Sequence, residues 1–277
     1  CILKACGKIR AVYEGKHIHG KIVTGGLLKK DVMVGNALVD MYMKSGLLQK
    51  ARKVFEELPV RDVISWNALI TGYSSQLEGE ACEALNCYEQ MRREGIRPDA
   101  VTYICILKAC SIVGCLEIGE AMDVEVRKQG LLEKDVMLGN TLVDMYAKCG
   151  SLEKAREVFE QLPERNLVSW NALISGYAQN GLGDEALKCF RQMQKEGVSP
   201  NNVTFMCILK ACCNMKDIEE GRLVHDNIIS SGHEQDVMVG SVLVEMYAKC
   251  GFLCEADVVL ESLPNKNVYS WNAIISG

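Results

Sequence analysis

The chain has 277 residues, of which 48% are hydrophobic and 24% are charged, and its formal net charge is −5. A net negative charge argues mildly against a partner that is held mainly by phosphate attraction, although it leaves room for a basic lane on one face. No stretch approaches the roughly 18 uninterrupted apolar residues of a membrane-spanning helix, so the sequence predicts no membrane partner.

Most of the 14 cysteines fall at matching places along the chain instead of forming the pairs of a small secreted framework. Cys6, Cys110 and Cys212 are one such set, and Ser45 stands where Cys149 occurs in a later copy. Free cysteine packs as a small buried apolar side chain. The pattern therefore predicts a reducing compartment and no structural disulfides.

Three short strings recur at a nearly constant interval. SWNA begins at Ser65, Ser169 and Ser270, and CILKAC and GNALVDMY keep the same interval with few changes. Self-similarity at a fixed interval is the signature of a repeat array. We therefore expect one solenoid over residues 1–277, and we expect the chain to be a window from a longer protein.

The prolines divide each interval into three kinds of repeat. Pro59, Pro163 and Pro264 close one kind and Pro98 and Pro200 close another, because helices stop before such residues. In chain order the predicted repeats are 1–31 (partial), 32–62, 63–99, 100–135, 136–166, 167–201, 202–236, 237–267 and 268–277 (partial).

Repeat 32–62 has the pattern of a helix pair. A first helix, which Gly46 ends, is followed by a second helix with one apolar face. The apolar residues of the two helices are Leu38, Met41 and Tyr42, then Ala51, Val54, Phe55 and Leu58. Repeat 167–201 follows the same logic, with Gly197 as its C-cap.

A single helix pair cannot bury its apolar faces, so neighbouring pairs must stack. The predicted fold class is all-α. It is an α-solenoid of antiparallel helix-turn-helix repeats, wound into a right-handed or otherwise curved superhelix, with the first helices along its concave surface.

The order of the three kinds of repeat resembles a known family. VMVGNALVDMY, VISWNALITGY and AVTYICILKAC follow one another as in the PLS class of pentatricopeptide repeat (PPR) proteins, of the plant organellar RNA-editing-factor type. Repeats 32–62, 63–99 and 100–135 match that family's short (S), standard (P) and long (L) repeats. The tetratricopeptide repeat, the chief alternative, has a uniform unit and a Trp-Leu-Gly-Tyr signature that this chain lacks.

The resemblance implies binding of single-stranded RNA, one repeat per nucleotide, in a mitochondrion or chloroplast. It also implies that the fifth and last residues of each repeat select the base, with the N-terminus toward the RNA 5′ end. The fifth places hold Asn36, Asn67, Ile104, Asn140, Asn171, Met206, Ser241 and Asn272. The last places hold Asp31, Asp62, Asp99, Asp135, Asn166, Asn201, Asp236 and Asn267.

The chemistry of these side chains fits base reading. An Asn amide offers a donor and an acceptor for a pyrimidine edge, whereas an Asp carboxylate can only accept, which suits the N3–H of uracil. Replacing Asp by Asn should relax the choice toward cytosine, and Ser241 with Asn267 resembles the family's adenine-selecting pair. The predicted RNA is 5′-UU-any-YY-any-A-3′, where Y is C or U. Ile104 cannot hydrogen-bond a base at the third position, and Met206 with Asp236 gives the sixth position at best a weak preference for a pyrimidine.

Two further sets of residues resemble the family's RNA contacts. The second place of each repeat is apolar and resembles the clamp that wedges each base between adjacent repeats. These residues are Met33, Ile64, Val101, Met137, Val168, Val203 and Met238, with Tyr269 in the last fragment. Lys44, Lys148 and Lys249 stand at identical places and look like phosphate contacts.

Each of these assignments has a plainer alternative. Asn, Ser and Asp at helix starts are also ordinary N-caps, and the three lysines could form a solvated face. The recurring Trp66, Trp170 and Trp271 are better explained as packing between repeats than as stacking platforms for bases.

The sequence contains no signature of a metal site or of catalysis. His17 and His19 form an H-x-H pair, but their counterparts in later repeats are not a constant ligand set. The zinc-deaminase signature, a nucleotide-binding glycine loop and G-x-S-x-G are absent. We therefore expect no cofactor, no metal and no catalytic residue.

The resulting functional hypothesis is the RNA-recognition array of an organellar C-to-U editing factor, with editing accessory proteins or a DYW cytidine deaminase domain as partner. Two alternatives stay open at this point. The array could serve splicing, processing or stability of an organellar RNA, or it could be a helical scaffold that binds proteins on its concave face.

Overall fold

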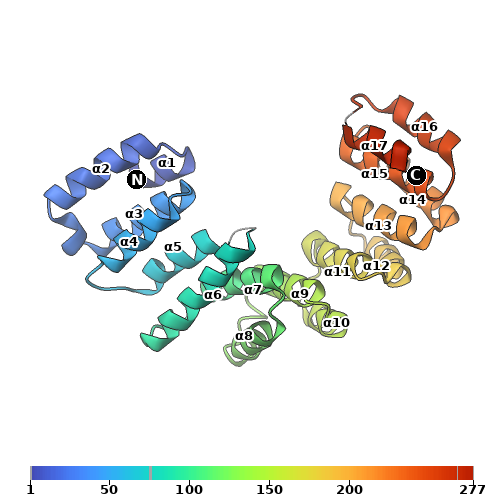
Figure 1. Cartoon of the computed structure of the whole chain (residues 1–277). Helices are drawn as coiled ribbons and strands as arrows, with labels where there is room; N and C mark the ends of the chain where they lie inside the picture. Colours follow the sequence, from blue (N-terminus) through green and yellow to red (C-terminus); the bar gives the residue numbers. More distant parts are fainter. Residues whose placement is uncertain (1, 75–76, 267, 277) are drawn as a thin grey trace. The chain divides into compact units, whose positions relative to one another are not determined.

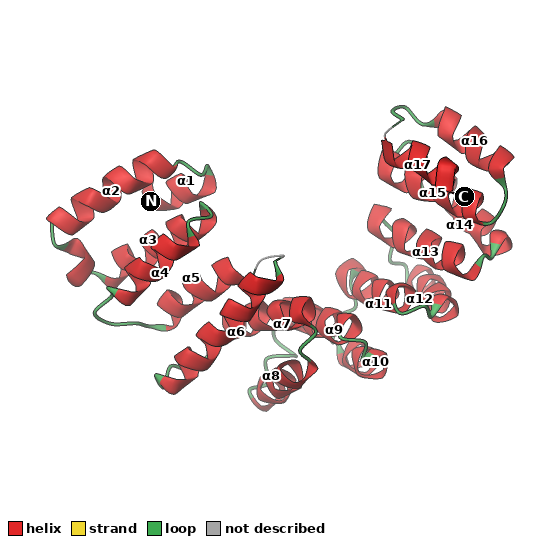
Figure 2. Cartoon of the chain, in the orientation of Figure 1, coloured by secondary structure: helices red, strands yellow, loops and turns green. Residues whose placement is uncertain are grey.

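The structure is a computed structural model that describes residues 2–74, 77–266 and 268–276. These residues form α-helices and one short 3₁₀ helix, and no strand occurs among them (Figures 1 and 2). The all-α expectation is confirmed. In the same residues no helix is both long enough and apolar enough to cross a membrane.

The chain divides into two compact parts, an N-terminal part (Cys1–Met145) and a C-terminal part (Tyr146–Gly277). The division falls inside helix α9 (Val136–Lys148). Each part consists of helices joined by short turns, as Figure 1 shows along the colour gradient.

In the N-terminal part the helices alternate between two layers. Helices α1, α3, α5 and α7 contact one another in sequence, and each packs on the helix that follows it. These first helices are α1 (Ile2–Lys8), α3 (Val32–Lys44), α5 (Val63–Tyr73) and α7 (Ala100–Val113). The second helices are α2 (Val12–Thr24), α4 (Leu48–Glu56), α6 (Glu78–Arg93) and α8 (Leu116–Lys128), and a 3₁₀ turn, η1 (Leu27–Lys29), follows α2.

The C-terminal part has the same two-layer arrangement. Helices α11, α13, α15 and α17 contact one another in sequence. The first helices are α11 (Leu167–Gln179), α13 (Asn202–Met215), α15 (Val237–Lys249) and α17 (Val268–Ser276). The second helices are α10 (Leu152–Gln161), α12 (Gly183–Lys195), α14 (Ile218–Ser230) and α16 (Leu253–Ser262).

The periodic apolar residues form the core between the layers, as the sequence predicts. In α3 and α4 the side chains of Leu38, Met41, Tyr42, Ala51, Val54 and Phe55 are buried, and Leu58 after α4 is buried as well. Complete burial of a Leu, Met, Val or Phe side chain contributes about 1.5–3 kcal/mol. Gly46 lies beyond the end of α3 at φ +74°, a left-handed conformation that a side chain would strain.

The tryptophans of the first helices serve packing. Trp66 of α5 and Trp170 of α11 are buried, each in edge contact with a phenylalanine of the preceding second helix at a ring distance of 4.6 Å. Trp271 differs, because 47% of its surface is exposed. The interpretation of all three tryptophans as core is therefore wrong for Trp271. Among the described residues, the helices that contact its helix α17 are α15 and α16.

Candidate nucleic-acid interface

Each last-place residue that the structure describes accepts hydrogen bonds from the start of the next first helix. Asp62 Oδ1 accepts the main-chain N–H of Ser65 at 2.8 Å, and Asp99 Oδ1 accepts that of Thr102 at 2.9 Å. The same role belongs to Asp31, Asp135, Asn166, Asn201 and Asp236. An N-cap of this kind stabilises a helix by about 1 kcal/mol. The capping interpretation is therefore correct, and it also fixes where each last-place side chain lies.

Three of the last-place residues, Asp62, Asp99 and Asn201, have a second partner, the fifth-place amide of the repeat that they close. Asn36 Nδ2 donates to Asp62 Oδ1 at 3.2 Å, across 26 residues of sequence. Asn67 Nδ2 donates to both carboxylate oxygens of Asp99, at 2.9 and 3.1 Å. Capping and pairing therefore coexist, and stacking of adjacent first helices brings the two predicted base-reading places together.

The equivalent pair in the C-terminal part joins two amides. Asn171 Nδ2 donates to Asn201 Oδ1 at 3.1 Å. Asn201 Oδ1 also accepts the main-chain N–H of Thr204 at 3.1 Å, so a single oxygen both caps α13 and accepts from Asn171. The amide nitrogen of Asn201 lies opposite that oxygen and takes no part in the cap.

Two threonines orient the amides of Asn67 and Asn171. Thr102 Oγ1 donates to Asn67 Oδ1 at 2.6 Å, and Thr204 Oγ1 donates to Asn171 Oδ1 at 2.6 Å. Because the carbonyl end of each amide is held, the nitrogen must face the last-place residue. Sequence reasoning missed these threonines, although both stand at the third residue of a first helix.

The acidity of Asp62 reflects these contacts. Burial alone would raise the pKa of this carboxyl group. The bonds from the main chain and hydroxyl of Ser65, and from the amide of Asn36, outweigh burial and hold the pKa of Asp62 below its usual value. The carboxylate is therefore ionised at neutral pH and can only accept hydrogen bonds.

A cavity of about 660 Å³ opens on the first-helix layer of the N-terminal part, over α1, α3 and α5. Residues from all three predicted sets line it: the amides of Asn36 and Asn67, the apolar side chains of Met33 and Ile64, and Lys44. The remaining lining residues are Lys4, Lys8, Ala37, Asp40, Ala68 and Thr71. Residues that the sequence assigns to base, clamp and phosphate thus share one surface.

The clamp residues are exposed although they are apolar. Their exposed fractions lie between 46% for Val203 and 79% for Met33, and the others in this range are Ile64, Val101, Met137, Val168 and Met238. Each stands at the second residue of a first helix, and in all of these helices except α3 the third residue is buried. The side chain of Tyr269 is outside the described residues. An exposed apolar residue at the same place in each repeat offers a row of surfaces on which flat rings can stack.

The three predicted phosphate contacts are exposed lysines that have acidic neighbours. Lys44 Nζ lies 2.7 Å from Asp40 Oδ2, and Lys249 Nζ lies 2.6 Å from Glu245 Oε1, in each case one turn earlier in the same helix. Lys148 is likewise exposed near the end of α9. The carboxylate of such a pair offsets part of the lysine's positive field, so these lysines would attract a phosphate less strongly than an isolated cation.

Sequence reasoning missed two further lysines at the cavity. Lys4 and Lys8 of α1 line it, both are exposed, and within the described residues neither forms an ion pair. The recurrence of CILKAC contained the signal, because Lys4 returns as the exposed Lys108 and Lys210. The cations of this surface therefore include lysines from a helix that the prediction left out.

The fifth places of repeats 100–135 and 202–236 are half-buried and apolar. Ile104 and Met206 form no hydrogen bond with the last places Asp135 and Asp236, as their side chains require. In repeat 202–236, however, the amide of Asn202, the first residue of α13, donates to Asp236 Oδ2 at 2.6 Å. Sequence reasoning missed this residue.

The other predicted base-reading residues vary in exposure. Asn140 is buried, whereas Asn272 is exposed. Ser241 is buried, and its hydroxyl donates to Val237 O at 2.7 Å within its own helix. Its predicted partner Asn267 lies outside the described residues, so the adenine-selecting pair stays a prediction.

His19 of the H-x-H pair packs against a tyrosine, whereas His17 is exposed. His19 Nδ1 lies 2.9 Å from the Tyr42 hydroxyl, and burial lowers the pKa of His19. His225 and Tyr247 repeat this contact at 2.9 Å. Among the described residues no group of three or more His, Cys, Asp or Glu side chains could hold a metal ion.

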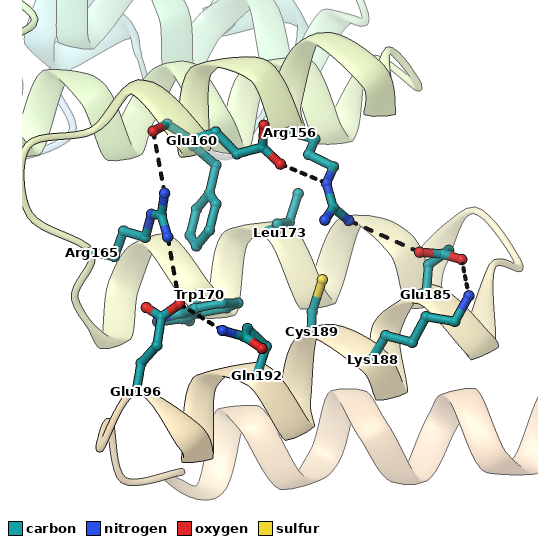
Figure 3. Close-up of a pocket in the computed structure, with 11 residues that line it drawn as sticks. Arg156, Glu160, Arg165, Trp170, Leu173, Glu185, Lys188, Cys189, Gln192 and Glu196 are labelled. Atoms are coloured by element: carbon teal, nitrogen blue, oxygen red, sulfur yellow. Dashed lines mark hydrogen bonds and ion pairs between the residues drawn. The ribbon is translucent and has the colours of Figure 1, made fainter.

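A second cavity, of about 450 Å³, lies over α10, α11 and α12 of the C-terminal part (Figure 3). Arg156 reaches from Glu160 at 2.9 Å toward Glu185 at 4.0 Å, and Arg165 faces Glu196 at 3.5 Å. Its cations thus have acidic partners, and none of the predicted base-reading, clamp or phosphate residues lines it. It is therefore a separate feature from the candidate interface.

The sequence is similar to models and members of one repeat family. A family model described as PPR repeat family matches residues 61–111 and 165–214, and one described as PPR repeat matches residues 36–63, 140–167 and 203–233. Among curated proteins, a chloroplastic pentatricopeptide repeat-containing protein of Arabidopsis thaliana is 40% identical over 277 residues, which are 100% of this chain and 44% of that protein. A mitochondrial one from the same plant is 35% identical over 99% of this chain and 49% of its own length.

Among solved structures, the pentatricopeptide repeat protein PPR10 in complex with an 18-nt psaJ RNA element matches with a TM-score of 0.77 at 20% identity. The match covers 94% of this chain and 39% of that one. A crystal structure of PPR10 from maize matches with a TM-score of 0.72 at 20% identity, over 99% of this chain and 41% of the other. These likenesses show the fold, a helical-repeat solenoid.

The chain spans less than half the length of both Arabidopsis relatives. The family-model matches run through most of the helix pairs described above, and the relatives match along nearly the whole chain. The chain belongs to the pentatricopeptide repeat family.

Proposed function

We propose that the chain binds single-stranded RNA, one repeat per nucleotide, and reads 5′-UU-any-YY-any-A-3′ from repeat 32–62 to repeat 237–267. The observation that carries the proposal is the hydrogen-bonded pairing of fifth-place amides with last-place carboxylates or amides. PPR10, which has this fold, is described in complex with an RNA element, and that supports the proposal by analogy.

Repeat 63–99 illustrates how uracil would be selected. Asp99 uses Oδ1 for the cap of α7. Among the described residues its Oδ2 accepts from Asn67 alone, which leaves a lone pair for a base. That lone pair suits the N3–H of uracil. The second hydrogen of Asn67 Nδ2 suits a pyrimidine carbonyl oxygen. Cytosine is disfavoured because its N3 and the carboxylate oxygen are both hydrogen-bond acceptors.

Stacking and charge would supply binding energy that does not depend on sequence. Exposed Met33 and Ile64 flank the amide of Asn36 on consecutive first helices, so a base that contacts Asn36 could be wedged between them. Aromatic platforms contribute about 1–3 kcal/mol per base, and aliphatic ones less. Lys4 and Lys8 would face the phosphates of the same strand and make binding dependent on salt.

In the cell we assign the chain to the recognition array of an organellar C-to-U editing factor of the PLS class. Its relatives are named chloroplastic or mitochondrial, which supports a mitochondrion or chloroplast as its location. The array would choose the cytidine, and a DYW deaminase domain or a recruited partner would carry out deamination.

The test of RNA reading is fluorescence anisotropy with short labelled RNAs. We expect the chain to bind the UU-any-YY-any-A sequence at least about tenfold more tightly than an RNA with adenines at the first two positions, equivalent to about 1.4 kcal/mol. Asn67→Ser should change the preference at the second nucleotide alone, and Asn171→Ser, the matched control, at the fifth alone. Absence of RNA affinity in the folded protein would favour the protein-binding scaffold.

A further inference from the structure

The two repeats with an apolar fifth place differ at their first residue. Repeat 100–135 begins α7 with Ala100, and repeat 202–236 begins α13 with Asn202. The first and fifth residues are one helical turn apart and lie on the same side of the helix. Asn202 can therefore reach the last-place residue that Met206, with its thioether, cannot pair with.

Asp236, like Asp99, caps the next first helix and also accepts from a side-chain amide on its second oxygen. Its Oδ1 accepts the main-chain N–H groups of Met238 and Val239, both at 2.9 Å, and so caps α15. Its Oδ2 accepts from Asn202 Nδ2 at 2.6 Å. The carboxylate is thus divided between a cap and an amide, as Asp99 is divided between α7 and Asn67.

The other apolar repeat lacks this arrangement. Asp135 Oδ1 caps α9 through the N–H groups of Met137 and Leu138, at 2.9 and 3.1 Å. Ala100 has no group that could pair with the carboxylate, and within the described residues no side-chain amide donates to Asp135. Repeat 100–135 is therefore an internal control for the effect of Asn202.

The carbonyl oxygen of the Asn202 amide is in the same state as that of Asn36, whose repeat is assigned to uracil. Asn202 Oδ1 is buried, and among the described residues it has no hydrogen-bond partner. Asn36 Oδ1 is in the same state. Thr102 and Thr204 donate to the carbonyls of Asn67 and Asn171. Val239, the third residue of α15, has no hydroxyl, and Ser65, the third residue of α5, donates to Asp62 Oδ1 instead of to Asn36.

We propose that Asn202 and Asp236 make repeat 202–236 a uracil-selecting repeat, with the first-place amide replacing the missing fifth-place amide. The inference rests on the proposed RNA-reading function and narrows the predicted sequence to 5′-UU-any-YY-UA-3′. Asp236 accepts the N3–H of uracil, and the second hydrogen of Asn202 Nδ2 faces a uracil carbonyl oxygen. The third nucleotide stays unread.

The experiment measures the binding of seven-nucleotide RNAs that differ only at the sixth position, with U, C, A or G there. We expect the wild-type chain to prefer U at this position about tenfold. Asn202→Ala should remove that preference and leave the preferences at the first two nucleotides unchanged. Asp236→Asn, which keeps the cap because Asn is as good an N-cap as Asp, should admit C as well as U.

The reciprocal variant uses the control repeat. Ala100→Asn should create a preference for U at the third nucleotide, where the wild-type chain has none. Indifference of the wild-type chain at the sixth position, with the preference for U intact at the first two, would overturn this inference and leave the proposed function standing. Indifference at every position would overturn both.

Discussion

The junction after repeat 63–99 and the junction after repeat 167–201 are nearly the same structure with one chemical difference. In both, a fifth-place asparagine donates to the last-place residue, at 2.9 Å to Asp99 Oδ1 and at 3.1 Å to Asn201 Oδ1. In both, a threonine hydroxyl holds the asparagine carbonyl at 2.6 Å, and a capping box starts the next helix.

The difference is the terminal side-chain atom of the last-place residue that lies opposite Oδ1. Asp99 presents a carboxylate oxygen there and Asn201 presents an amide nitrogen. The shared contacts fix the geometry of the pair, so the identity of a single atom remains to distinguish bases. An oxygen accepts the N3–H of uracil, whereas an NH₂ group donates to the N3 of cytosine.

The largest effect is expected when the packing that both junctions share is lost. Trp170 precedes Asn171 and is buried against Phe159, with a ring distance of 4.6 Å. We expect Trp170→Ala to lower the free energy of unfolding by about 3–5 kcal/mol through the cavity that it leaves. Urea denaturation followed by circular dichroism measures the loss. The exposed Val168→Ala should change stability by less than about 0.5 kcal/mol, and an equally small loss for Trp170→Ala would contradict the packing role.

Exchange of the distinguishing atom is the next largest effect. Asp99→Asn should admit C at the second nucleotide, and Asn201→Asp should narrow the fifth nucleotide to U, each by about 1–3 kcal/mol of discrimination. Both variants keep their caps, so their stability should match that of the wild type. Anisotropy titrations with U or C at those two positions provide the measurement. Unchanged discrimination in both variants would show that the last place does not read the base.

The next effect concerns Thr102 and Thr204, whose hydroxyls hold the asparagine carbonyls. Thr102→Val removes the hydroxyl that holds Asn67 Oδ1 and half of the capping box, so we expect a loss of about 1 kcal/mol of stability and weaker selection at the second nucleotide alone. Thr204→Val should act in the same way at the fifth nucleotide. Thr102→Ser, which keeps a hydroxyl, is the control. Equal losses at all nucleotides would indicate a purely structural role.

The lysines should give the smallest effect, and it should not depend on sequence. Lys4→Ala and Lys8→Ala should each lower the salt-dependence slope of binding by about 0.7, the value for one phosphate contact on a single strand. Lys44→Ala should lower it less, because Asp40 already pairs with Lys44 at 2.7 Å. Titrations at several salt concentrations measure the slopes. A larger change for Lys44 than for Lys4 would reverse this assignment.

Much of the fold follows from local patterns in the sequence. The apolar spacing of residues such as Leu38, Phe55 and Met193 predicts buried helix faces, and Gly46 and Gly197 mark helix ends where positive φ is required. These features depend on residues within one or two turns, and short-range periodicity reports them directly. Trp271 was misjudged because its burial depends on which helices cover α17, which no local pattern contains.

The candidate interface was only partly predictable for the same reason. The sequence identifies the fifth and last places, but it presents capping and base reading as alternatives. In the structure Asp62 and Asp99 each cap a helix and also accept from an amide. The roles of Thr102 and Asn202 depend on contacts across 34 or 35 residues, which appear only when repeats stack. Lys4 could have been found from its recurrence as Lys108 and Lys210.

Selection of RNAs from a fully randomised pool by the intact chain, followed by sequencing of the bound fraction, tests base reading most directly. We predict enrichment of uracil at two adjacent positions, then one unselected position, then two pyrimidines, in the 5′ to 3′ direction. Enrichment of purines at the first two selected positions, or recovery of the starting pool without enrichment, would contradict it.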